Sequence, residues 1–114
     1  MGPRILEKMK DNIFISIITP TYNRADELIH LLRSISEQTY HLGKIECIIS
    51  DDGSDDDTET IVKEWQGKSF FDIIYLTQVN KGPGAARNHG LEKSSGDLIL
   101  FIDSDPKILI KSSS

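Results

Sequence analysis

The sequence has one cysteine, no long apolar run and no excess of positive charge. The single cysteine, Cys47, excludes a disulfide within the chain, and the isoleucines beside it favour a buried strand position over a nucleophile. No apolar run approaches the roughly 20 residues that cross a bilayer, and the N-terminus lacks the apolar segment of a secretory signal. A net charge of −5 argues against nucleic acid or an anionic membrane as a general partner. We therefore expect a cytoplasmic protein without a membrane span.

Two nucleotide-binding motifs are also missing. Residues 82–84 read Gly-Pro-Gly, but Arg87 stands at the third glycine position of a dinucleotide fingerprint, and the segment follows the third predicted strand rather than the first. No G-x-x-x-x-G-K-[ST] sequence is present, which argues against a phosphate-loop NTPase. What remains is a helix N-terminus near Lys81 and Arg87, which suits an anion such as a diphosphate. The alternative is a tight loop and a helix packed closely through Gly90, with Arg87 in solvent.

What the chain does contain is an apolar run that ends on two acids. Residues 97–106 read DLILFIDSDP, so that Asp103 and Asp105 follow five consecutive apolar residues. Such runs are typical of parallel strands that are covered on both faces. Two carboxylates this close repel each other unless they lie in water or share a divalent cation such as Mg²⁺ or Mn²⁺. A solvated Asp-Ser-Asp-Pro turn is the alternative, and this stretch alone leaves both interpretations open.

Four apolar segments alternate with three segments of helical periodicity. We expect strands over residues 13–19, 44–50, 70–77 and 98–102, with Pro20 ending the first because it has no N–H to donate. Ser54 and Asp57 have the spacing of a capping box at the second helix. Helical connections specify right-handed crossovers and a mainly parallel sheet, and we predict a doubly wound α/β fold of strand order 3-2-1-4. The first two helices would cover one face and the third the other.

This strand order predicts where a ligand binds. The turn after the first strand, which carries Tyr22, would lie between the ends of the second and fourth strands, which carry Asp52 and Asp103. Ligands of doubly wound sheets bind at such a switch point. With one helix on its second face, the sheet would lack cover there and along the edge of the fourth strand. We therefore expect self-association through that face or edge.

Four motifs in this order resemble the inverting glycosyltransferases of family 2, which have the GT-A fold. They are TPTYNR at 19–24, SDDGSDD at 50–56, NKGPGAARNHGL at 80–91 and GDLILFIDSD at 96–105. Each motif is weak alone, whereas four at the family's spacings are specific. The resemblance implies a nucleotide-sugar-binding, Rossmann-like half domain over residues 13–105, after an N-terminal extension at 1–12 and before a tail at 106–114. It also implies a hexosyltransferase that uses a UDP-sugar in glycan or polysaccharide synthesis.

The resemblance further implies roles for single residues. Tyr22 would lie against the nucleobase, Asp52 would accept the imide N–H of uracil, and Asp51 would support that loop. Asp103 would approach the ribose, and Asp105, with Asp103, would hold the Mn²⁺ or Mg²⁺ that bridges the diphosphate. The implied nucleotide-binding residues are Pro20, Thr21, Tyr22, Asn23, Asp51, Asp52, Gly82, Arg87, Asp103 and Ser104.

Two departures from the family bear on activity. Pro106 stands where family members commonly have a further acid, and proline restrains Asp105 toward extended conformations. The family's catalytic base and acceptor site lie beyond the position of Asp105, where nine residues remain, so we assign no base and no acceptor, and expect this chain alone to be inactive. Two alternatives stay open. One is a non-catalytic nucleotide-binding or assembly fragment, and the other is a haloacid-dehalogenase-type phosphatase, which would have a Thr in place of Lys107.

Overall fold

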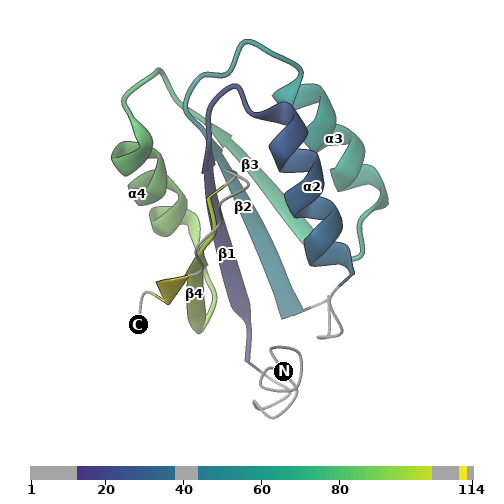
Figure 1. Ribbon diagram of the computed structural model, residues 1–114. Coiled ribbons are helices and arrows are strands. Elements are labelled where there is room, and N and C mark those ends of the chain that lie inside the picture. Colours follow the sequence, from purple (N-terminus) through teal and green to yellow (C-terminus); the bar gives the residue numbers. More distant parts are fainter. Residues whose placement is uncertain (1–12, 38–43, 104–110, 113–114) are drawn as a thin grey trace.

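The computed structural model describes residues 13–37, 44–103 and 111–112. Within them lies one sheet of strand order β3-β2-β1-β4-β5, parallel except for β5, which runs antiparallel to β4 (Figure 1). The strands are β1 (Ile15–Thr21), β2 (Ile45–Asp51), β3 (Asp72–Thr77), β4 (Leu98–Phe101) and β5 (Lys111–Ser112). The helices are α2 (Ala25–Ser36), α3 (Thr58–Lys68) and α4 (Pro83–Lys93). The first four strands have the predicted order 3-2-1-4.

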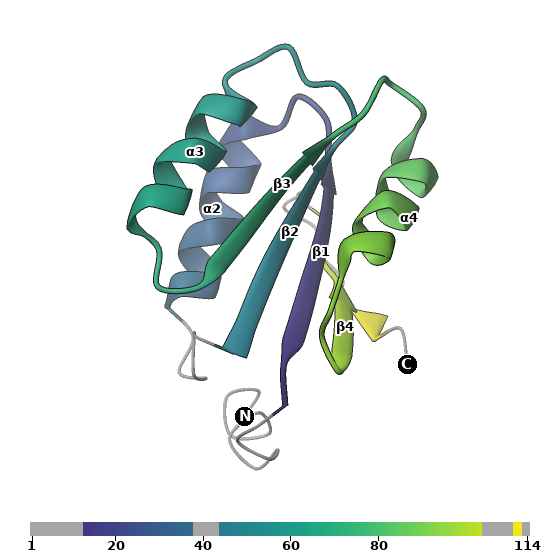
Figure 2. The same cartoon turned by 180° about the vertical axis from the view of Figure 1, so that it is seen from behind.

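Helices cover both faces of the sheet, as predicted. Figures 1 and 2 show α2 and α3 on one face and α4 on the other. Because successive strand residues point to opposite faces, the odd-numbered residues of β1 and β2 pack beneath α2 and α3. The buried apolar cluster on that side comprises Ile15, Ile17, Leu28, Leu31, Leu32, Ile35, Ile45, Cys47, Ile49, Val62, Phe71, Ile73 and Ile102.

Cys47 lies in the middle of this cluster and is fully buried. Burial raises the pKa of its thiol to about 12. A thiol with so high a pKa is protonated at neutral pH and is a poor nucleophile. The prediction of a buried strand position for Cys47 is confirmed.

On the opposite face, α4 approaches the sheet through small residues. Its buried members are Ala86 and Gly90. A Cβ at Gly90 would lie 2.6 Å from Cγ2 of Ile18 and 3.6 Å from Cγ2 of Ile48, so a larger residue forces the helix outward. Ser50 donates its hydroxyl to the carbonyl of Ala86 at 2.6 Å. Close approach and this hydrogen bond place the N-terminal end of α4 beside the ends of β1 and β2.

Strand β1 extends two residues further than predicted. Pro20 lies inside the strand, in register with Ser50, so the prediction that it ends the strand is wrong. The carbonyl of Thr21 accepts a hydrogen bond from the N–H of Asp52 at 2.9 Å. Since successive strand residues bond to opposite neighbours, the nitrogen of Pro20 faces β4, whose pairing with β1 already ends at Ile18. The missing N–H therefore removes no hydrogen bond to β2.

A buried carboxylate anchors the other end of the sheet. Glu46 is 4% exposed, and its Oε2 accepts hydrogen bonds from Ser16 Oγ at 2.5 Å and from Ser95 N at 2.8 Å. The N–H of Gly96 donates to Ser16 Oγ at 2.8 Å. A Cβ at Gly96 would come within 2.6 Å of the backbone nitrogen of Ser16, so glycine is required there. These contacts fix where β4 begins, and hence where Asp103 emerges at its far end.

The outer edge of β4 is paired with β5, with Leu100 opposite Ser112 and Phe101 opposite Lys111. The predicted uncovered edge is therefore wrong over this stretch, because the strand Lys111–Ser112, expected as part of a tail, supplies the missing hydrogen bonds. The N-terminal extension predicted at 1–12 and the rest of the predicted tail lie outside the described residues. None of the helices in the described ranges is long and apolar enough to cross a membrane.

Candidate functional site

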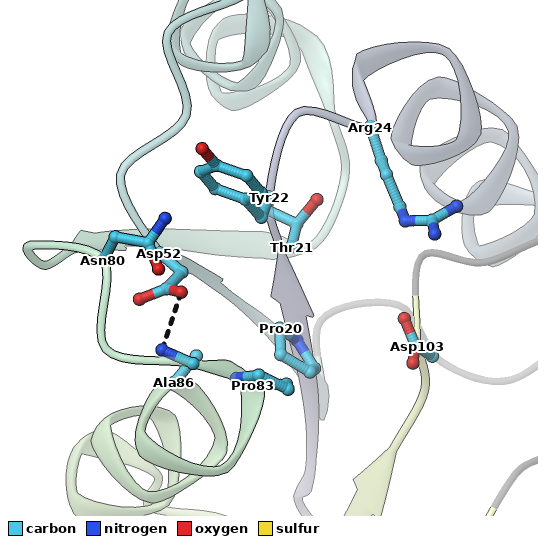
Figure 3. A pocket seen from close by; sticks show the side chains of 10 residues that line it. Pro20, Thr21, Tyr22, Arg24, Asp52, Asn80, Pro83, Ala86 and Asp103 are labelled. Carbon is cyan, nitrogen blue, oxygen red and sulfur yellow. Dashed lines mark hydrogen bonds between the residues drawn. The ribbon is translucent and has the colours of Figure 1, made fainter.

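A pocket of about 390 Å³ opens at the carboxyl ends of the strands. This volume lies within the range of roughly 300–1,000 Å³ that is typical of small-molecule sites. The lining residues come from the end of β1, the start of α4 and the segments after β1, β2, β3 and β4. They are Pro20, Thr21, Tyr22, Arg24, Asp52, Asn80, Gly82, Pro83, Ala86 and Asp103 (Figure 3). The pocket therefore occupies the switch point of the doubly wound sheet.

Several of the predicted site residues meet in this pocket, namely Pro20, Thr21, Tyr22, Asp52, Gly82 and Asp103. Figure 3 shows Tyr22 and Asp52 on one side of it and Arg24 and Asp103 on the other. Three predicted residues do not line it: Asn23, Asp51 and Arg87. Ser104 and Asp105 lie outside the described residues, so Asp103 alone represents the predicted metal pair here.

Asp52 is held by three hydrogen bonds and is 4% exposed. Its Oδ1 accepts from Gln78 Nε2 at 2.8 Å and from Lys81 N at 2.7 Å, and its Oδ2 accepts from Gly82 N at 2.9 Å, the dashed line of Figure 3. Burial alone would raise the pKa of Asp52, but the three hydrogen bonds favour the ionised form and bring the pKa below its ordinary value. A carboxylate has about four acceptor positions, so Oδ2 retains one for an N–H donor of a ligand.

The hydrogen bonds of Asp52 involve the backbone at the N-terminal end of α4. The backbone N–H groups of Lys81 and Gly82, which directly precede α4, donate to Asp52. The side chains of Lys81 and Arg87 are exposed, and neither lines the pocket. Among the described lining residues, the cationic side chain is that of Arg24. Positive charge thus reaches the pocket from the loop after β1 rather than from α4.

Asp51 faces away from the pocket, toward α2 and α3, because adjacent strand residues point to opposite faces. It is 1% exposed, and its carboxylate accepts hydrogen bonds from the hydroxyl of Tyr75 and from the N–H of Ser54, the latter at 2.9 Å. Burial and the bond to Asp51 raise the pKa of Tyr75 above its ordinary value. These contacts support the loop after β2 from behind.

Asn23 contacts the same loop. Its N–H donates to Ser54 Oγ at 2.7 Å, and its Oδ1 accepts from Asp55 N at 2.9 Å. The predicted capping box is therefore wrong: α3 begins at Thr58, and Ser54 serves Asn23 instead. The carboxylate of Asp56, which was not predicted to cap, accepts from Thr58 N at 3.0 Å at the start of α3.

The lining residues that were not assigned a role from sequence are Arg24, Asn80, Pro83 and Ala86. All of them lie inside the motifs at 19–24 and 80–91, so those motifs indicated the segments that line the pocket. Which members of a motif face the pocket depends on loop conformation, and that is not visible in residue types alone.

Asp103 lies exposed at the pocket edge, just after β4. Carboxylate oxygens are the ligands that Mg²⁺ and similar cations prefer, and Mg²⁺ is usually held by one or two carboxylates together with substrate phosphates. Among the residues of known position, no group of three or more His, Cys, Asp or Glu side chains could hold a metal. Asp103 thus offers one carboxylate of the kind that such a cation prefers.

Comparisons with known proteins give consistent matches. The sequence model described as Glycosyl transferase family 2 matches residues 16–108. The chain is 36% identical over 92 residues to Glycosyltransferase AglE of Haloferax volcanii, covering 81% of this chain and 30% of AglE. It is 36% identical over 93 residues to the poly(ribitol-phosphate) beta-N-acetylglucosaminyltransferase TarS of Staphylococcus aureus, covering 82% of this chain and 16% of TarS. The chain thus spans less than a third of the length of these relatives.

Two similar crystal structures contain nucleotides. S. aureus TarS 1–349 in complex with UDP-GlcNAc superposes with a TM-score of 0.72 at 35% identity, over 82% of this chain and 27% of that chain. The glucosyl-3-phosphoglycerate synthase of Mycobacterium tuberculosis, in complex with Mn²⁺, UDP and glucosyl-3-phosphoglycerate, gives a TM-score of 0.68 at 32% identity, over 90% of this chain and 37% of that chain.

Proposed function

This chain belongs to glycosyl transferase family 2, and from that membership we propose that its pocket binds the nucleotide of a UDP-sugar donor. Family membership leaves no support for the phosphatase alternative. The whole transferase activity, including the transfer of a hexose to an acceptor in glycan or polysaccharide synthesis, forms the wider proposal. Within that activity, the described residues bear on the binding of the donor, because they line the pocket.

The observation that carries the proposal is the acceptor position that Asp52 retains beside Tyr22. Uracil presents an N–H at N3, whereas cytosine presents an acceptor at the same position. A buried, ionised carboxylate with its other positions already occupied would favour the uracil base and repel the cytosine base. The ring of Tyr22 is 43% exposed, which leaves a flat surface on which the base would lie.

From this base site the donor would extend toward Asp103 and Arg24 on the other side of the pocket (Figure 3). Asp103 would approach the ribose and, together with Asp105, would hold Mn²⁺ or Mg²⁺; Asp105 lies outside the described residues. When bound, such a metal neutralises negative charge on the leaving diphosphate. Arg24 would place a second positive charge on the same side, in the role that was predicted for Arg87.

Isothermal titration of the protein with UDP and with CDP, in the presence of Mn²⁺, tests the base assignment. We expect UDP to bind at least about tenfold more tightly, since a hydrogen bond to a charged group contributes about 1.5–3 kcal/mol. Asp52→Asn, which removes the charge and turns a donor toward the base, should abolish that preference. The matched control is Asp57→Asn, because Asp57 is exposed in the same loop and its side chain makes no capping hydrogen bond. Equal affinity for UDP and CDP would refute the assignment.

A further inference from the structure

The loops after β1 and β2 stay hydrogen-bonded to each other beyond the ends of their strands. The last backbone hydrogen bond between the ends of β1 and β2 is 2.9 Å long. Beyond it, side chains of both loops accept hydrogen bonds from backbone N–H groups of the other loop. The contacts join Thr21 to Asp52, Asn23 to both Ser54 and Asp55, and Ala25 to Asp56. The two loops are therefore joined directly, and they carry the two residues proposed to contact the base.

Asn23 is the centre of this connection, which we call the loop latch, defined as the contacts of Asn23 with Ser54 and Asp55. Its N–H donates to Ser54 Oγ at 2.7 Å, while its side-chain Oδ1 accepts from Asp55 N at 2.9 Å. Its φ of 51° lies in the left-handed region, which Asn tolerates better than most residues. Both the backbone turn and the side-chain acceptor at position 23 thus suit asparagine.

The latch adjoins Tyr22 in the chain. This residue lies between Thr21, whose carbonyl is bonded to Asp52 N, and Asn23, which is bonded to the neighbouring loop. Nearly half of Tyr22 is exposed, so packing against the protein restrains its ring only in part. Backbone restraint on both sides is therefore what keeps the ring beside Asp52, on the same side of the pocket (Figure 3).

On the basis of the proposed UDP binding, we propose that Asn23 is a positioning residue that holds Tyr22 beside Asp52 through the loop latch. Asn23 does not line the pocket, so it would act on the base through Tyr22 and not by contact, unlike the direct role expected from sequence. A ring that is already oriented loses less freedom when the base binds, and affinity rises accordingly. Without the latch, the same ring must be ordered by the ligand.

Two substitutions separate the hydrogen bond from the backbone conformation. Asn23→Gly keeps the left-handed conformation accessible but removes the Oδ1 acceptor. The double variant Asn23→Asp/Asp55→Asn restores an acceptor at position 23 and leaves the net charge of the loops unchanged, and the backbone N–H of residue 55 remains as donor. Asp55→Asn alone is the control for the second change.

We expect Asn23→Gly to weaken UDP binding by about fivefold, the size expected when one more side chain must be ordered on binding. The double variant should bind within about twofold of the parent protein. Amide hydrogen exchange at residue 55 should be faster in Asn23→Gly and return to the parent rate in the double variant. Unchanged exchange in Asn23→Gly would show that the latch does not hold the two loops.

A cycle with Tyr22→Ala distinguishes positioning from direct contact or general loop damage. If Asn23 acts through Tyr22, Asn23→Gly should cost almost nothing in the Tyr22→Ala background. A fivefold loss that persists there would overturn the positioning role, as would equal UDP affinity of Asn23→Gly and the parent. A parent protein that binds no UDP would instead remove the proposed function, so the two failures are told apart.

Discussion

Asp51 and Asp52, at the end of β2, make different contacts because successive residues of a strand point to opposite faces of the sheet. Asp51 is bonded to Tyr75 and Ser54 behind the pocket, whereas Asp52 faces α4 and the pocket. The sequence indicated that both acids lie at a ligand-binding edge, and the alternation of strand side chains predicts which of them enters the pocket once the strand end is known. That end depends on tertiary pairing, which extended β1 past Pro20 and β2 to Asp51.

The ionised state of Asp52 makes stability depend on pH. Its pKa is depressed in the folded protein, so the stabilisation is fully present above the unfolded value, about 3.9, and is lost as pH falls through the lower folded value. We expect the difference in unfolding free energy between the parent and Asp52→Asn to shrink as pH is lowered from 6 to 3. Urea unfolding at a series of pH values measures it. A difference that does not change with pH would contradict this assignment.

Sequence alone could not place Asn23, Arg24 and Arg87. Asn23 follows Tyr22 in the same motif, yet its side chain reaches into the loop after β2, and a positive φ is not encoded in residue spacing. Arg87 and Arg24 are both exposed cations in motifs, and only Arg24 lines the pocket, because α4 turns Arg87 away from it. The motifs predicted a cationic side chain near the site, but whether Arg24 or Arg87 lines the pocket depends on the conformation of the loops.

At the scale of elements, the packing of α4 on the sheet depends on Gly90. A Cβ at Gly90 would meet Ile18 at 2.6 Å, so we expect Gly90→Ala to lower the unfolding free energy by about 1–3 kcal/mol through overpacking. Gly84→Ala is the matched control in the same helix, because a Cβ there meets nothing within 4 Å. That variant should be more stable by about 0.4–1 kcal/mol. Denaturant titrations of both variants measure the difference, and equal effects would argue against close packing at Gly90.

The order and type of the elements were predictable because the apolar runs and helical periodicities are strong. Strand order 3-2-1-4 followed from the doubly wound arrangement, in which the fourth strand returns to the other side of the first, and the helices occupy the predicted faces. Element ends were less predictable. The start of α3 moved to Thr58 because Ser54 bonds to Asn23 across the loops, a contact between residues 31 positions apart that local capping patterns do not contain.

For the whole molecule, the face beneath α4 is less completely covered than the face beneath α2 and α3. Ile74 and Phe101 stand in register with Ile48 and Ile18, which face α4, yet both remain half-buried. We expect self-association through this face, seen as a molecular mass that rises with concentration in light scattering and falls in an Ile74→Gln variant. A constant monomer mass at high concentration would refute it.

The pocket lies at the carboxyl ends of the strands. The only thiol of the chain, that of Cys47, is fully buried and has a pKa raised to about 12. A cysteine introduced at Gly67, in the last turn of α3, meets nothing within 4 Å and lies at the end away from the pocket. At neutral pH a maleimide would therefore couple to that one position, giving a homogeneous conjugate that is attached away from the pocket without first removing the native thiol.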